Sequence, residues 1–119
     1  MAEVDVVIVG AGNAALCAAL SAREQGASVV VLERASEDEG GGNTRFTAGA
    51  IRTVYNGVDD LRALMPDLTD EEVAITDFGT YTQDQFFDDM FRVTQYRCDA
   101  DLAEKLVTRS YDTLMWMKD

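Results

Sequence analysis

The chain has 119 residues, with 22 acidic and 10 basic side chains and a formal net charge of −12. This length allows no more than one ordinary domain, and the acidic balance disfavours nucleic acid and anionic lipid, which carry the same sign of charge. The apolar runs fall short of the ~20 residues that span a bilayer, and the start has no basic segment typical of a signal peptide. We therefore expect a cytoplasmic protein with no membrane insertion.

The amino-terminal part predicts a β-α-β unit. Residues 4–9 are almost continuously apolar and β-branched, which is typical of a strand buried on both faces in a parallel sheet. The alanine-rich residues 16–25 predict a helix that Gly26 ends. Residues 28–32 predict a second buried strand. The fold class predicted from this order is α/β, with a Rossmann-like start.

A glycine turn lies between the first strand and the helix. It has the pattern Gly-x-Gly-x-x-Ala, and Glu33 ends the second strand, a combination typical of dinucleotide-binding units. Gly10 permits the tight turn, and Gly12 lets the backbone approach a pyrophosphate, while Ala15 keeps the helix close to the strand. Glu33 is predicted to accept hydrogen bonds from the adenosine ribose and would repel a 2′-phosphate, which argues against NADP.

A second glycine-rich segment, residues 40–50, bears on the choice between NAD and FAD, which the turn alone leaves open. Its glycines offer backbone donors beyond the pyrophosphate, and its small residues leave room for a flat isoalloxazine ring. The alternative is a linker, but a linker has no need of Arg45 and Phe46. We interpret residues 1–52 as an FAD-binding β-α-β unit with a flavin loop.

Residues 53–119 predict an acidic helical segment. Capping boxes at Thr69 and Thr82 predict two helix starts, and Asp99 is predicted to cap a third helix. Aromatic and methionine side chains between 86 and 91, and an apolar stripe between 102 and 117, are predicted to form the core. The chain has no histidine and no spacing typical of a metal site.

Residues 4–33, 41–45 and 48–51 resemble the amino terminus of the fumarate reductase/succinate dehydrogenase flavoproteins. Residues 81–117 resemble the tricarballylate dehydrogenase branch, which a flavoprotein of precorrin-3B (cobalamin) synthesis shares. The resemblance implies the FAD-binding portion of an oxidoreductase that acts on a di- or tricarboxylate such as tricarballylate, fumarate or succinate. The alternatives are the precorrin-3B flavoprotein and a non-catalytic nucleotide-binding module.

The resemblance also implies which residues contact FAD. Those that match the family's cofactor site are Gly10, Ala11, Gly12, Asn13, Ala14, Ala15, Glu33, Arg34, Gly41, Gly42, Asn43, Thr44, Ala48, Gly49 and Ala50. The resemblance implies that residues 53–119 lead towards a capping domain that is absent from this chain. The family's acid–base residues lie in that domain and later in the chain, so no catalytic residue is expected here, and the chain alone is expected to be inactive. A carboxylate substrate and an electron-accepting partner protein are expected only of a longer parent, of which this chain would be a truncated domain.

Asn43 decides how the flavin is expected to be held. In the resemblance it stands roughly where succinate dehydrogenase-like members carry the histidine that tethers the flavin. An amide cannot replace that nucleophile, but it can donate and accept hydrogen bonds along the cofactor. We therefore expect non-covalent FAD. The alternative interpretation of Asn43 is a residue that merely tolerates a left-handed turn.

Overall fold

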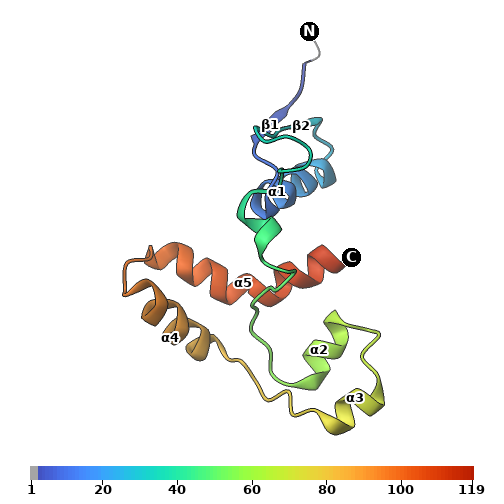
Figure 1. Ribbon diagram of the computed structural model, residues 1–119, viewed down its shortest axis with the longest axis vertical. Coiled ribbons are helices and arrows are strands. Elements are labelled where there is room, and N and C mark those ends of the chain that lie inside the picture. Colours follow the sequence, from blue (N-terminus) through green and yellow to red (C-terminus); the bar gives the residue numbers. More distant parts are fainter. Residues whose placement is uncertain (1–2) are drawn as a thin grey trace. The chain divides into compact units, whose positions relative to one another are not determined.

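The computed structural model describes residues 3–119, which form two compact units. The first ends at Ile51 and holds the strands β1 (Val6–Val9) and β2 (Val29–Leu32) and the helix α1 (Asn13–Glu24). The second begins at Arg52 and is helical (Figure 1). The chain is therefore mixed α/β, as its sequence predicts.

The first unit is a β-α-β arrangement with a parallel two-stranded sheet. Val6 pairs with Val29 and Val9 with Leu32, so the two strands run in full register. A side-chain clamp closes the start of the sheet, because Asp5 Oδ2 accepts hydrogen bonds from the Ser28 backbone N–H at 2.8 Å and from its hydroxyl at 2.7 Å. These bonds lower the pKa of Asp5, so the clamp is charged at neutral pH.

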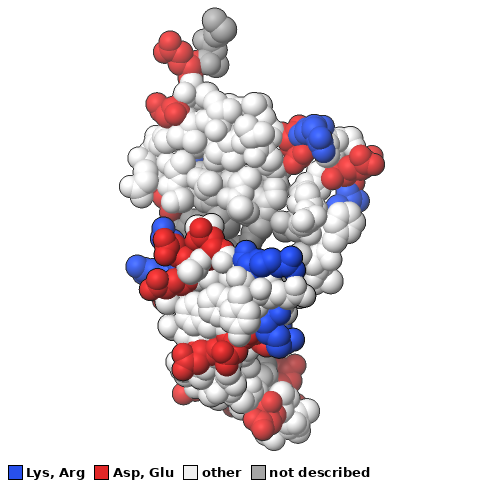
Figure 2. Space-filling view, turned by 90° about the vertical axis from the view of Figure 1, so that its left-hand side faces the viewer, with Lys and Arg blue, Asp and Glu red and all other residues white. Residues whose placement is uncertain are grey.

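The prediction that both strands are buried on both faces is wrong for this chain. Val9 is 84% exposed and Leu32 is 51% exposed, and α1 contains no buried residue. Among residues 3–119 no third strand pairs with either edge of the sheet, and α1 is the helix that packs on it. In Figure 2 a broad area below the acidic side chains at the top of the view carries neither acidic nor basic side chains.

Helix α1 begins at Asn13, three residues earlier than the predicted start. Gly12 serves as its N-cap in an extended conformation, φ −79° and ψ 177°. At the other end the helix stops as predicted, because Gly26 adopts a left-handed φ of 86° and donates its N–H to Arg23 O. The earlier start matters because it places the first turn of α1 directly after the glycine turn.

The second unit contains α2 (Val58–Leu64), α3 (Asp70–Ile75), α4 (Gln83–Thr94) and α5 (Ala100–Lys118). Both predicted capping boxes are confirmed: Thr69 and Thr82 each accept from the backbone of the third helical residue, whose side chain accepts from the cap in return. Asp99 caps α5 as predicted, through the Leu102 N–H. No helix in the described part of the chain has the length and apolar character needed to cross a membrane.

The core of this unit is smaller than the predicted apolar stripes. Phe86, Ala103 and Val107 are buried, together with the hydroxyl of Ser110, which accepts the Val54 N–H and donates to Val107 O. Leu102, at the predicted stripe's start, is 65% exposed. The reason is geometric: α4 and α2 are the helices that pack on α5, and they cover only part of its apolar face.

Candidate functional site: a glycine turn at the start of helix α1

The glycine turn, residues 10–15, brings several backbone N–H groups together at the start of α1. Gly10 has a left-handed φ of 103°, which glycine adopts without a steric penalty, and its N–H donates to Leu32 O at 2.7 Å. Leu16 supplies the first N–H that bonds back into α1, to Gly12 O. The amides of Ala14 and Ala15 precede it and have no acceptor within the helix. They form a helix amino end suited to an anionic group.

The second glycine segment folds back onto this helix end. The Thr44 hydroxyl accepts the Asn13 N–H at 2.9 Å. A Cβ added at Gly12 would lie 3.3 Å from Gly41 O and 3.4 Å from Thr44 Oγ1. The absence of a side chain at Gly12 therefore admits the loop as well as any ligand. Sequence reasoning assigned both segments to one site but missed this direct contact.

Glu33 reaches the same turn from the end of β2. Its Oε2 accepts the Ala11 N–H at 2.9 Å, and its Oε1 accepts the Ala35 N–H at 2.8 Å. The hydrogen bond from Ala35, followed by that from Ala11, holds the pKa of this exposed carboxyl below its ordinary value. A carboxylate offers about four acceptor positions, so the ionised Glu33 retains capacity for further donors.

The remainder of the glycine segment is a short helix and a turn. Residues Gly42–Phe46 form a 3-10 helix, introduced by Gly41 at φ 100°. Asn43 is not among the non-glycine residues with positive φ in the described chain, so the interpretation of Asn43 as a left-handed turn residue is wrong. Ala48 is one of them, at φ 51°, which no sequence signal indicated. The Ala50 N–H closes this turn on Thr47 O at 2.9 Å.

The structure thus joins some predicted site residues and leaves others apart. The turn, the start of α1, Glu33 and the loop residues Gly41 and Thr44 meet through the contacts above. The side chain of Arg34 is exposed. Residues 48–50 form a separate turn, in which the Ala50 N–H donates to Thr47 O. No group of three or more histidine, cysteine or acidic residues in the described chain is arranged to hold a metal ion.

Residues 5–119 match the sequence family described as FAD binding domain. The chain belongs to this family. It is 33% identical over 117 residues to digoxin reductase of Eggerthella lenta, covering 98% of this chain and 18% of that protein. It is also 33% identical over 116 residues to a fumarate reductase (cytochrome) of Shewanella frigidimarina, covering 96% of this chain and 17% of that protein.

A third relative matches this chain over a shorter stretch. L-aspartate oxidase of Mycobacterium leprae is 45% identical over 56 residues, which are 47% of this chain and 11% of that protein. The chain therefore spans less than a fifth of the length of these relatives. The predicted relationship to fumarate reductase-type flavoproteins and the predicted FAD cofactor are confirmed at the level of the family.

The geometry of this FAD binding domain fits its cofactor. A dinucleotide presents a pyrophosphate, which needs close backbone approach and free amide donors. The first turn of α1 offers those donors, and Gly12 leaves no side chain in front of them. The ionised Glu33 beside this turn fits ribose hydroxyls, which can donate to a carboxylate.

Proposed function

We propose that this chain is the FAD-binding portion of an oxidoreductase and that the predicted site residues hold the cofactor. The observation that carries the proposal is the meeting of the helix amino end, Gly12 and the Glu33 carboxylate at one turn. When bound, FAD supplies hydride transfer, and the protein supplies orientation and electrostatics. Residues 1–52 would form the cofactor unit, and 53–119 would lead towards further domains.

The proposed contacts divide by cofactor group. Ala14 and Ala15 would donate their amides to the pyrophosphate, and Glu33 would accept from the adenosine ribose. The remaining proposed contacts are backbone and small-residue contacts along the cofactor and beside the isoalloxazine. They are Gly10, Ala11, Gly12, Asn13, Arg34, Gly41, Gly42, Asn43, Thr44, Ala48, Gly49 and Ala50.

The proposed substrate is a di- or tricarboxylate such as fumarate, succinate or tricarballylate. The similarity to a fumarate reductase supports this class, and the resemblance of residues 81–117 to the tricarballylate branch narrows it. The name digoxin reductase shows that similar proteins differ in substrate. The flavoprotein of precorrin-3B synthesis shares that resemblance. A role in precorrin-3B synthesis is therefore the second candidate function.

The proposal is tested first on the 119-residue chain alone. We expect no turnover with carboxylate donors and a dye acceptor, because the chain has no histidine and spans under a fifth of its relatives. The flavoprotein that contains this chain should show flavin absorbance bands and dye-linked activity. Turnover by the isolated chain above a heat-killed control would contradict the expected inactivity. A purified longer parent protein that carries no flavin would contradict the proposal.

The FAD is expected to be non-covalent. The chain has no histidine, and Asn43, on the 3-10 helix of residues Gly42–Phe46, cannot form the tethering bond. Acid precipitation of the flavoprotein followed by centrifugation should leave the yellow colour in the supernatant. A pellet that keeps its flavin fluorescence after washing and denaturing electrophoresis would show that another residue tethers the cofactor.

A further inference from the structure

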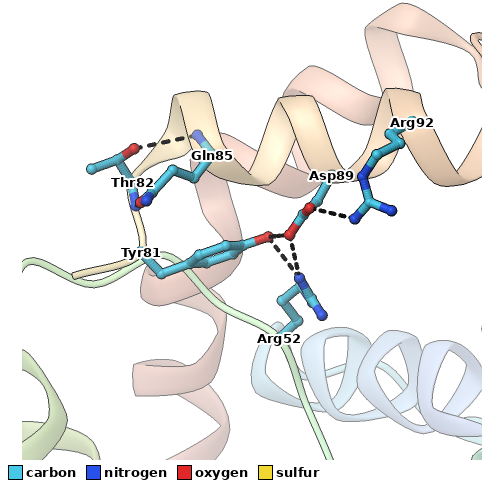
Figure 3. Close-up of polar contacts among 6 residues, drawn as sticks. All are labelled: Arg52, Tyr81, Thr82, Gln85, Asp89 and Arg92. Carbon is cyan, nitrogen blue, oxygen red and sulfur yellow. Dashed lines mark hydrogen bonds and ion pairs between the residues drawn. The ribbon is translucent and has the colours of Figure 1, made fainter. Parts of the chain in front are cut away.

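Arg52 lies two residues after the glycine-rich segment 40–50, the proposed flavin loop, and the side chains of Tyr81 and Asp89 both contact it. Its Nη1 donates to the Tyr81 hydroxyl at 2.7 Å and to Asp89 Oδ2 at 2.8 Å, and its guanidinium lies 5.3 Å from the centre of the Tyr81 ring (Figure 3). The side chain of Arg52 is otherwise 60% exposed. An exposed arginine held by three such contacts has a restricted position.

Asp89, on α4, is the common partner of this cluster. The Tyr81 hydroxyl donates to Asp89 Oδ2 at 2.8 Å, and Arg92 Nη2 donates to Oδ1 at 2.7 Å (Figure 3). Both carboxylate oxygens are thus engaged, by two arginines and one phenol. Arg92, followed by Tyr81, holds the pKa of Asp89 below its ordinary value, so the carboxylate is charged at neutral pH.

The cluster is built on a fixed frame. Tyr81 and Tyr55 exchange both backbone hydrogen bonds, at 2.9 and 3.0 Å. The Tyr81 ring packs against Phe86, whose side chain is buried, with 5.5 Å between ring centres. The capping box of Thr82 then begins α4, which carries Asp89. Arg52 is therefore anchored to an ordered part of the second unit.

Stability alone is a weak reason for this arrangement, because exposed ion pairs contribute little. Its distinctive feature is the position of Arg52 in the chain, two residues after the proposed loop ends at Ala50. We propose that Asp89 is a positioning residue, which holds Arg52 and thereby fixes the carboxyl end of the flavin loop. This inference rests on the proposed FAD-binding function.

The test compares Asp89→Asn with wild type in the flavoprotein that contains this chain. We expect the dissociation constant of FAD to rise about 3- to 10-fold, since one charge-assisted cluster at a partly exposed position is lost. We also expect a changed visible absorbance spectrum of the bound flavin, which a purely structural role would not alter. Tyr81→Phe should act in the same direction, and Asp89→Glu should restore most of the affinity.

The matched control is Asp112→Asn. Asp112 forms a similar exposed pair with Arg109 on α5, at 3.9 Å, away from any cluster, and its loss should leave both readouts unchanged. Thermal unfolding of each variant identifies a folding defect; if Asp89→Asn does not fold, Tyr81→Phe decides the result. This inference alone would be overturned if the Asp89 or Tyr81 variant bound flavin with the same affinity and the same spectrum as the control. Wild-type protein without flavin would overturn the proposed function as well.

Discussion

Glu33→Ala is expected to weaken FAD binding about 10- to 100-fold in the proposed longer parent protein. The variant removes the proposed acceptor for the ribose and also the acceptor that holds the Ala11 N–H in the glycine turn. Both losses act on the same cofactor half, so the variant should be purified largely without flavin. Titration of the apoprotein with FAD, followed by flavin fluorescence, measures the change.

The pH dependence of this effect follows from the direction of the pKa shift. Hydrogen bonds to Ala35 and Ala11 lower the pKa of Glu33 in the folded protein. The contribution of the carboxylate to the free energy of unfolding is therefore present above the ordinary pKa of Glu33. It is lost only as the pH falls through the lower pKa of the folded protein. Between about pH 6 and 8 the Glu33 carboxylate is ionised throughout. Titration of Glu33 should therefore cause no change in FAD affinity over this range.

Two further variants separate the charge from the shape of Glu33. Glu33→Gln keeps one acceptor oxygen and loses the charge, so we expect an intermediate loss of affinity. Glu37→Ala removes a carboxylate from the same exposed segment and should leave the dissociation constant unchanged. If Glu33→Ala binds FAD as tightly as wild type, the end of β2 does not face the ribose.

Gly12→Ala is expected to weaken FAD binding, because the loop that contacts Gly12 must shift to admit a side chain. Overpacking typically costs about 1–3 kcal/mol of stability, and a loss of that size in binding would correspond to about 5- to 150-fold in affinity. The backbone of Gly12, at φ −79°, is open to any residue, so conformational strain is not the cause. The new Cβ would meet Gly41 O at 3.3 Å and Thr44 Oγ1 at 3.4 Å, and in dinucleotide-binding units a glycine at this position lets the backbone approach the pyrophosphate. Calorimetric titration with FAD measures the loss.

Gly40→Ala is the matched control for this change. Gly40 begins the segment 40–50 but is not among the proposed FAD contacts. A Cβ at Gly40 would lie 3.5 Å from Ser36 O and 3.7 Å from Glu33 Cγ, which are ordinary contacts, and its backbone is not left-handed. Alanine at Gly40 should therefore leave both the FAD affinity and the melting temperature nearly unchanged. Equal affinities for the Gly12 and Gly40 variants would show that neither the loop contact nor the pyrophosphate approach depends on Gly12.

The sequence by itself determined the local elements of this protein. The glycine turn, the end of α1 at Gly26 and the capping boxes at Thr69 and Thr82 all depend on residues within a few positions of one another. Capping and turn preferences act over that range, so the pattern alone predicts them. The glycine spacing by itself indicated only a dinucleotide, and the family and its cofactor followed from the resemblance of residues 4–33, 41–45 and 48–51 to known flavoproteins.

Only the tertiary structure decided which distant groups meet. The Thr44 hydroxyl accepts the Asn13 N–H at the start of α1 from 31 positions away, and Arg52 reaches Asp89 across 37 positions, which no local preference encodes. Burial was mispredicted at Val9 for a related reason: an apolar, β-branched strand shows what a side chain can bury, not whether these residues supply a neighbour to cover it. Local chemistry specified the elements of this domain, and the return of loops onto them assembled the candidate site.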